Sequence, residues 1–493
     1  MTDSARPLGV RAALRSPRQL SREVFAGIVT TLALVPEVIS FSVIAGVDPM
    51  VSLVASVVLV LTMTFLGGRP GVITAAAGSV ALVIAPLVRE YDVSYVLPTV
   101  ILAGLLQIVF GVTGLARLMR YVPRSVMLGF VNALGVLIFA AQVPHLMHGG
   151  GLGVILFGAT LAIVLLLPLL TKVVPAPLIA IVVVTAIVMI WNLGVPNVSD
   201  EGQIGGGLPG LTELAVPLSL ETLQIIAPTA ISVALVGLME SLLTAKLVDE
   251  ITETPSHKGR ESWALGVANI FSGLYGGMAG CAMIGQTVLN VKTSGARTRL
   301  STFIAGVFLL GLITGLSGVM GQIPMVALAA VMMVVAVMTV DWHSVRPSTI
   351  RRMPLSETLV MVVTIAVVVM TDNLAYGVIA GVVFAMVLFA RRVAHVITVE
   401  RAVDDAAETV RYTVRGPLFF GSSNDLVEQF SYSEDPRRVV IDLTHAQIWD
   451  ASTVAALDSV ETIFAKHGAT VAIEGLDERS VRFHGRLSGT LGS

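Results

Sequence analysis

The sequence has few charged residues, and this lack excludes an ordinary soluble protein. Lys, Arg, Asp and Glu make up 13% of the chain, whereas a soluble domain typically contains about 25%. Hydrophobic residues make up 55%, and the mean hydropathy is +0.86. Residues 391–493 have the composition of a soluble domain, while residues 24–389 are mostly long apolar runs. The sequence therefore predicts a membrane part followed by a soluble part.

The absence of a second cysteine and of known catalytic and nucleotide-binding motifs reduces the number of possible function classes. Cys281 has no second cysteine with which to form a disulfide. The chain contains no Walker motif, HExxH motif, CxxC pair or GxGxxG in a strand context, so ATP-driven transport and familiar enzyme chemistry have no support. We expect no enzymatic activity, no cofactor, no bound metal and no nucleic-acid partner. The Arg-rich segment from Arg6 to Arg22 precedes an apolar run without a small-residue cleavage site, which predicts an uncleaved first helix.

Apolar runs of bilayer length, about 20 residues, occur at eleven places. They are residues 24–46, 50–67, 94–115, 125–144, 152–170, 178–195, 222–247, 301–319, 323–340, 354–371 and 374–390. Three weaker segments, 72–88, 260–280 and 282–291, are short, rich in small residues or interrupted by glycine. Together these segments predict fourteen membrane crossings.

The distribution of Lys and Arg tests this number, because basic residues in short loops gather on the cytoplasmic side. With the N-terminus inside and fourteen crossings, Arg89 is the one basic residue in an outside loop. The inside loops hold Arg69, Arg117, Arg120, Arg124, Lys172, Lys246, Lys258, Arg260, Lys292, Arg297, Arg299, Arg346, Arg351, Arg352, Arg391 and Arg392. We therefore expect a multi-pass protein of the bacterial cytoplasmic (inner) membrane with both termini in the cytoplasm.

Fourteen crossings divide into seven and seven, and a repeat with an odd number of crossings must insert in opposite orientations. This predicts an inverted repeat, as in many secondary transporters. The weak segments 72–88 and 282–291 occupy corresponding positions, third and tenth, in the two halves. Paired weak segments of this kind point to a midplane site made by discontinuous helices.

The chain divides into three predicted parts. Residues 1–23 form a cytoplasmic N-terminus, residues 24–397 form the fourteen-segment transmembrane domain, and residues 398–493 form a small cytoplasmic α/β domain. In this last part, strands are predicted at 409–414, 438–443 and 470–474, and helices at 424–430 and 451–466.

Two acids lie deep in the apolar segments, where an ionisable side chain is costly and marks a functional candidate. Glu37 lies in the first segment, after the helix-weakening Pro36, and Glu240 lies in the eighth. These segments begin the two repeats, so the inverted repeat brings both carboxylates toward the midplane. The alternative is that each acid only bonds a neighbouring hydroxyl or backbone group and fixes helix packing.

Small and polar residues accompany these acids on the two weak segments. They are Gly78 and Ser79 on the third segment, and Gly285, Gln286 and Thr287 on the tenth. If these segments are half-helices whose N-termini meet, their free N–H groups and positive dipole ends make an anion site without Arg or Lys. Close helix packing by small residues is the alternative.

Two further side chains lie one helical turn after the acids. Phe41 follows Glu37 and would line the same site, or would pack against lipid or the protein core. Thr244 follows Glu240 and either supplies an oxygen to a cation or bonds back to its own helix.

Six stretches, in this order, resemble the SulP anion transporters, also called solute carrier family twenty-six. In the membrane part they are LALVPEVISFSVIAGVDP, GGRPGVITAAAGSVALV, GLMESLLTAKLVDE and GGMAGCAMIGQTVLNVKTSGARTRLS. The stretches VRGPLFFGS and VVIDLTHAQIWDASTVAALD resemble a STAS domain, the module shared with anti-sigma factor antagonists. The resemblance covers nearly the whole chain.

The resemblance implies a core domain and a gate domain, with the substrate between helices three and ten and facing helices one and eight. By position, Glu37 and Phe41 match the family's substrate residues on the first helix, and Glu240 matches its acid on the eighth. Ser79 and the Gly285–Thr287 stretch match the half-helix anion site. The resemblance also suggests a homodimer embedded in membrane lipid.

The STAS resemblance adds a regulatory expectation. Ser452 and Thr453 match the region of the phosphorylated hydroxyl in isolated STAS modules, which switch between protein partners. Asp450 and Ser452 are also ordinary N-cap residues. A membrane-anchored regulator with a cytoplasmic protein partner is therefore one alternative function, although fourteen crossings exceed what an anchor needs.

One departure from the family shapes the predicted mechanism. Animal electromotile members carry an arginine near the start of helix ten, where this sequence has Thr287, so the predicted site holds two carboxylates and no fixed cation. An anion beside an ionised Glu would be repelled by about 1 to 4 kcal/mol, so a proton or a sodium ion must compensate.

We expect proton-coupled symport of a carboxylate or dicarboxylate such as fumarate. The alternatives are sodium coupling at Glu240 and Thr244, bicarbonate, sulfate or chloride as substrate, anion exchange, or a passive channel, for which no continuous polar lining is visible.

Overall fold

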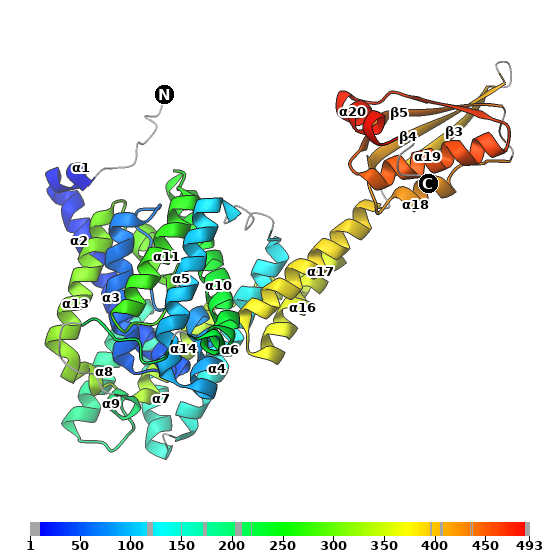
Figure 1. Cartoon of the computed structure of the whole chain (residues 1–493). Helices are drawn as coiled ribbons and strands as arrows, with labels where there is room; N and C mark the ends of the chain where they lie inside the picture. Colours follow the sequence, from blue (N-terminus) through cyan, green and yellow to red (C-terminus); the bar gives the residue numbers. More distant parts are fainter. Residues whose placement is uncertain are drawn as a thin grey trace. The chain divides into compact units, whose positions relative to one another are not determined.

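The computed structural model describes residues 10–115, 122–148, 150–170, 175–202, 210–217, 219–394, 397–404, 408–433, 435 and 437–488. Arg117, Arg120 and Lys172, which the basic-residue pattern placed in inside loops, lie outside these residues. The chain forms two compact units, Met1–Val382 and Val383–Ser493 (Figure 1).

Helices occur at all fourteen predicted membrane segments. Twelve of the segments each contain one helix: α2 Pro17–Ala45, α3 Pro49–Leu66, α5 Val96–Thr113, α6 Arg124–His148, α7 Gly150–Leu170, α8 Ala176–Ile190, α10 Leu220–Thr252, α11 Lys258–Leu274, α13 Arg299–Gly321, α14 Met325–Thr339, α16 Leu355–Thr371 and α17 Leu374–Ala394. The predicted segments 178–195 and 260–280 extend beyond their helices, which end at Ile190 and Leu274. Among the described residues, eight helices are long and apolar enough to span a membrane, and α8, α14 and α16 are shorter apolar helices. Short helices connect them: α1 Val10–Arg15, η1 Val93–Tyr95, α9 Val198–Glu201 and α15 Pro347–Ile350.

The third and tenth segments are discontinuous, as the sequence predicted. The third consists of strand β1, Thr74–Ala75, followed by α4, Gly78–Tyr91. The tenth consists of strand β2, Cys281–Ala282, then α12, Ile284–Val288, and the π-helix η3, Leu289–Thr293. β1 and β2 pair antiparallel, with Thr74 opposite Ala282 and Ala75 opposite Cys281. Because the paired strands run in opposite directions, the helices that follow them leave in opposite directions, and their N-termini lie on either side of the strand pair.

Helix packing follows the inverted repeat and separates two bundles. In one bundle, α5 packs on α10 and α11, and its repeat partner α13 packs on α2 and α3. In the other, α6 packs on α14 and α16, while α14 also packs on α7. Both half-helices, α4 and α12, pack against α2 and α10. This arrangement confirms the predicted fold, and it places the helices that carry Glu37 and Glu240 beside both half-helices.

The second unit contains a four-stranded sheet with the order β3, β4, β5, β6. Its strands are β3 Thr398–Asp404, β4 Thr409–Leu418, β5 Arg438–Ile448 and β6 Thr470–Glu474, and its helices are α18 Ser423–Glu428, α19 Ala451–Lys466 and α20 Glu478–Leu487. β3 is antiparallel to β4, while β4, β5 and β6 are parallel. The sheet and α19 enclose a core that includes Tyr412, Leu443, Leu457 and Phe464. β3 and α20 were not predicted, because β3 is exposed along its length and lacks an apolar alternation.

Candidate functional site

The N-terminus of α4 presents free backbone donors inside the membrane unit. Ala77 precedes the helix in an extended conformation, and the first helical hydrogen bond runs from Ala81 N to Ala77 O. The N–H groups of Gly78, Ser79 and Val80 have no acceptor among the described residues. A Cβ at Gly78 would lie 2.7 Å from Phe41 Cε1 and 3.2 Å from Ile138 Cδ1. The ring of Phe41 therefore covers this helix end.

The N-terminus of α12 is similar, but more open. The first bond of this helix runs from Thr287 N to Met283 O, which leaves the N–H groups of Ile284, Gly285 and Gln286 without an acceptor in the described part of the chain. Gly285 is exposed, and a Cβ there would meet no atom within 4 Å. Open space thus reaches this helix end.

Thr287 and Gln286 face different neighbours. Thr287 is buried, and its Oγ1 accepts a hydrogen bond from Ile73 N at 3.0 Å, so it connects the tenth segment to the third. Gln286 donates from Nε2 to Ala33 O at 3.5 Å, while its Oε1 is buried without a partner. The Gln286 amide also interacts with the carboxyl group of Glu37.

Glu240 joins three segments at the end of α4. Its Oε2 accepts hydrogen bonds from the hydroxyl of Ser79 and from the thiol of Cys281, the latter at 3.0 Å. Ser79 Oγ lies 3.6 Å from Cys281 Sγ. Glu240 Oε1 has no hydrogen-bond partner among the described residues, and it is not fully buried. One carboxylate oxygen is therefore fixed by two donors, and the other remains accessible.

Each half-helix is matched with the acid of the other repeat. Ser79, from the first repeat, bonds Glu240, from the second. Gln286, from the second repeat, interacts with Glu37, from the first. Glu37 is only partly buried. The structure therefore places Ser79 beside Glu240 and Gln286 beside Glu37.

Thr244 bonds back to the protein backbone. Its hydroxyl lies 2.8 Å from Glu240 O and 3.3 Å from Ala282 O. It therefore fixes β2 against α10, and the geometry favours the back-bonding alternative. No group of three or more His, Cys, Asp or Glu in the described residues is arranged to hold a metal ion.

The sequence analysis missed the polar residues behind β2. Asn269 Oδ1 accepts from Gly280 N at 2.9 Å, and Asn269 Nδ2 donates to Gln107 Oε1 at 2.8 Å. These fully buried amides hold the residue before Cys281 in place. These two amides could have been identified from the sequence, because a polar side chain inside an apolar run is a functional candidate in the same way as an acid. No feature of the sequence indicated the contact between Cys281 and Glu240.

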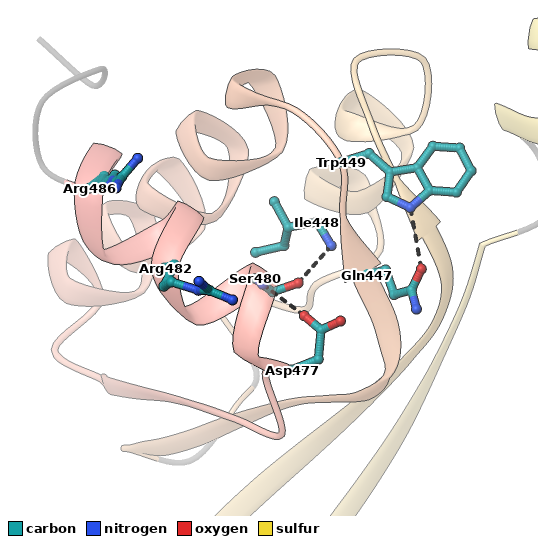
Figure 2. Close-up of a pocket in the computed structure, with 7 residues that line it drawn as sticks. All are labelled: Gln447, Ile448, Trp449, Asp477, Ser480, Arg482 and Arg486. Atoms are coloured by element: carbon teal, nitrogen blue, oxygen red, sulfur yellow. Dashed lines mark hydrogen bonds between the residues drawn. The ribbon is translucent and has the colours of Figure 1, made fainter.

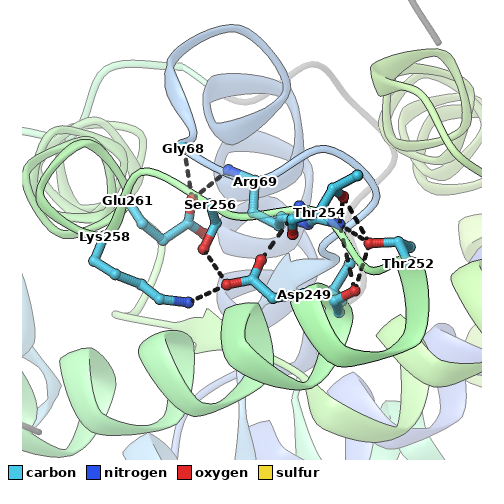
Figure 3. A network of polar contacts seen from close by, with 9 residues as sticks. Gly68, Arg69, Asp249, Thr252, Thr254, Ser256, Lys258 and Glu261 are labelled. Carbon is cyan, nitrogen blue, oxygen red and sulfur yellow. Dashed lines mark hydrogen bonds and ion pairs between the residues drawn. The ribbon is translucent and has the colours of Figure 1, made fainter. Parts of the chain in front are cut away.

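A polar network joins the loop between α3 and β1 to the C-terminal end of α10 and to the start of α11 (Figure 3). Arg69, which lies between α3 and β1, pairs with Asp249 at 3.2 Å and donates to Thr254 O at 2.8 Å and Val248 O at 3.3 Å. Glu261 accepts from Gly68 N at 2.6 Å and Arg69 N at 3.0 Å. The segment that leads into Ser79 is thereby attached to the C-terminal end of the helix that carries Glu240.

In the second unit, Ser452 lies at the start of α19, as predicted. Asp450 is the N-cap residue of this helix and accepts from Thr453 N at 3.1 Å. Ser452 itself is exposed and lines a groove with Phe420. The exposed hydroxyl is compatible with the phosphosite expectation, and the N-cap role falls to Asp450.

The second unit also has a pocket of about 490 Å³ at the carboxyl end of β5 (Figure 2). Trp449, Arg482 and Arg486 line it together with Gln447, Ile448, Asp477 and Ser480. Ser480 accepts from Ile448 N at 3.2 Å, which holds the start of α20 against the strand. This pocket could not be expected from the sequence analysis, because α20 was not predicted.

An inverted repeat with two half-helices that begin beside a buried acid defines a secondary transporter. Comparison with family models identifies the type: residues 20–151 and 149–364 match the sulfate permease family, and residues 400–485 match the STAS domain. The chain belongs to the sulfate permease family, that of the SulP and solute carrier twenty-six anion transporters, and it carries a C-terminal STAS domain. It is therefore a multi-pass anion transporter, not an enzyme.

Related proteins support this assignment over nearly the full length. YbaR of Bacillus subtilis, a candidate sulfate transporter, is 46% identical over 461 residues, which cover 94% of this chain and 95% of YbaR. The bicarbonate transporter BicA of Picosynechococcus is 26% identical over 501 residues, covering 90% of this chain and 86% of BicA.

Two solved structures have the same fold. Murine Slc26a9, an anion transporter in the inward-facing state, superposes with a TM-score of 0.82 at 17% identity, covering 95% of this chain and 87% of that one. The transmembrane domain of a cyanobacterial BicA superposes with a TM-score of 0.65 at 25% identity, covering 73% and 98%.

Proposed function

We propose that this protein is a proton-coupled symporter that takes up a small carboxylate or dicarboxylate, such as fumarate, by alternating access. The anion binds between the N-termini of α4 and α12, where free N–H groups and the positive ends of the helix dipoles attract it. Glu240 carries the coupling proton, and Glu37 and Phe41 face the substrate from α2.

The observation that carries this proposal is the contact between Glu240 and Ser79 at the end of α4. An ionised Glu240 would repel an anion bound at this helix end by about 1 to 4 kcal/mol. No Lys or Arg side chain in the described residues bonds or pairs with Glu240, Ser79 or the Gly285–Thr287 stretch. A mobile cation must therefore compensate, and Glu240 Oε1 is accessible to a proton.

The walls of the site favour a carboxylate with a short hydrocarbon part. Phe41 and Ile138 stand over Gly78 and offer an apolar surface. Fumarate can place one carboxylate at a helix end and its alkene carbons against this surface, whereas sulfate and bicarbonate have no apolar atoms to bury.

Uptake of sulfate or bicarbonate is the second candidate, because the relatives YbaR and BicA carry those assignments. In that case the uptake would be coupled to sodium or would occur by anion exchange. Thr244 would then have to turn from its backbone acceptors toward a cation.

The proposal also includes the membrane, the orientation of the chain and its partners. The basic-residue pattern favours the inner membrane with both termini in the cytoplasm, so the STAS domain would meet cytoplasmic protein partners there. A homodimer in the lipid bilayer is the expected assembly.

Uptake into proteoliposomes tests the proposal. Radiolabelled fumarate, sulfate and bicarbonate are offered under an imposed proton gradient, an imposed sodium gradient, or neither. We expect fumarate to accumulate under the proton gradient. Glu240→Gln should abolish this accumulation with the fold intact, because the amide has a similar shape but cannot exchange a proton. Accumulation driven by sodium alone, or undiminished in Glu240→Gln, would contradict the proposal.

A further inference from the structure

The hydroxyl of Ser79 has two competing acceptors. Ser79 lies one residue into α4, beside the free N–H groups that would hold an anion, yet its hydroxyl donates to Glu240 Oε2. A hydroxyl carries one proton and donates one strong hydrogen bond at a time. An anion at the end of α4 and an ionised Glu240 therefore compete for the same donor.

The charge on Glu240 decides this competition. An ionised carboxylate accepts hydrogen bonds about twice as strongly as a neutral group does. A proton that arrives on the accessible Oε1 makes the carboxyl group neutral and weakens Oε2 as an acceptor. Cys281 still donates to Oε2 at 3.0 Å, so this oxygen keeps a partner if Ser79 turns away.

We propose that the Ser79 hydroxyl is a hydrogen-bond switch that makes anion binding depend on the protonation of Glu240. With Glu240 ionised, the hydroxyl donates to Oε2. With Glu240 protonated, the hydroxyl rotates about the Cα–Cβ bond and donates to the bound anion. The proton enters and leaves through Oε1, and no other covalent bond changes. The switch rests on the proposed function, which supplies both the anion and the proton.

Few other groups near Glu240 could couple anion binding to the protonation of its carboxyl group. From β2, Cys281 is the titratable group that contacts the carboxylate. From α2, Glu37 interacts with Gln286 and makes no hydrogen bond to Glu240 among the described residues. The neighbouring helices α5 and α11 contribute the neutral amides of Gln107 and Asn269.

Equilibrium binding to the purified full-length protein tests the switch. The probe is radiolabelled fumarate, or sulfate if fumarate is not taken up, measured at one acidic and one alkaline pH. The wild-type protein should bind more tightly at acidic pH. Ser79→Ala should lower the acidic affinity by about tenfold or more, the effect of one hydrogen bond to a charged acceptor, and leave the alkaline affinity unchanged. The ratio of the two affinities should then fall by the same factor, and the part that remains comes from the direct repulsion between ionised Glu240 and the anion.

Ser262→Ala is the matched control, because Ser262 is equally buried and its hydroxyl bonds only its own helix, at Lys258 O. It should keep the wild-type ratio. Ser79→Thr and Ser79→Val form a second pair of nearly equal shape, and only Thr retains the hydroxyl. The ratio should keep its wild-type value in Thr and fall in Val by about the same factor as in Ser79→Ala.

A wild-type ratio in Ser79→Ala or Ser79→Val would overturn the switch, as would an equal fall of the ratio in Thr and Val. Glu240→Gln separates this failure from that of the proposed function. If Glu240→Gln loses proton-driven accumulation while the Ser79 variants keep the ratio, only the switch is wrong. If Glu240→Gln accumulates the anion normally, the coupling role itself is wrong.

Discussion

Gly78 is the first residue of α4 and Gly285 is the second residue of α12, but their surroundings differ. Phe41 covers Gly78, while Gly285 faces open space. The same residue type therefore has two roles: at Gly78 it allows close approach of an aromatic ring, and at Gly285 it leaves the helix end accessible.

This difference predicts unequal effects of the same substitution. Gly78→Ala should push the Phe41 ring away and destabilise the protein by about 1 to 3 kcal/mol, the usual cost of overpacking. Gly285→Ala should leave the stability unchanged. Thermal unfolding in detergent measures both. Phe41→Leu should partly restore the Gly78→Ala protein, and equal melting temperatures for the two alanine variants would show that Phe41 does not constrain Gly78.

Glu37→Gln should act more mildly than Glu240→Gln. Glu37 is partly buried and interacts with the neutral Gln286 amide, so it is not part of the Ser79 contact. We expect accumulation to persist, with a shift in apparent affinity or in the pH profile of uptake. Initial uptake rates over a range of pH and substrate concentration measure this shift. Unchanged profiles would assign Glu37 to helix packing.

At the scale of elements, the sequence predicted the parts that depend on local pattern. Apolar runs located the long helices, and glycine placement identified the broken segments at Gly78 and Gly285. Contacts between distant residues were not predictable in this way. Cys281 lies 41 positions from Glu240, and no periodicity links them. β3 was not predicted, because an exposed edge strand has no buried face that would require alternating apolar and polar residues.

The strand pair between the repeats depends on Thr287. Its hydroxyl is the acceptor for the buried Ile73 N–H. Thr287→Val should leave this donor unsatisfied and cost about 1 to 3 kcal/mol. Thr287→Ser keeps the acceptor and should cost much less. The comparison uses thermal unfolding, and a Thr287→Val protein as stable as the wild type would show that this hydrogen bond does not contribute.

Arg69 attaches the third segment to α10. Its side chain is 6% exposed and pairs with Asp249. Arg69→Gln should destabilise the membrane unit by about 1 to 3 kcal/mol, because it removes the hydrogen bonds to Thr254 O and Val248 O, while Asp249 keeps its pair with Lys258. Arg411→Gln is the contrast in the second unit: that side chain is 48% exposed, and its pairs with Asp442 and Glu474 should contribute at most about 1 kcal/mol. Similar unfolding temperatures for both variants would contradict this difference.

At the scale of the whole molecule, the proposed anion site and the STAS domain occupy separate stretches of chain. The side chains of the proposed anion site lie between Glu37 and Thr287, and the soluble unit has its own hydrophobic core. A chain that ends at residue 397 should therefore bind and transport the anion. Proteoliposome uptake per unit of folded protein measures this. Complete loss of flux in a folded, truncated protein would favour the regulator alternative.

The exchange of acids between repeats has a consequence for the origin of the fold. Ser79 needs Glu240, and Gln286 interacts with Glu37, so neither half of the chain holds a complete pair. A half-length ancestor could have worked only as two copies inserted in opposite orientations in the membrane. Each copy would then have supplied the acid that pairs with the half-helix of the other. The same reasoning applies to the present gene cut between α9 and α10: each piece alone should bind no anion, and co-expression of the two pieces should restore the site.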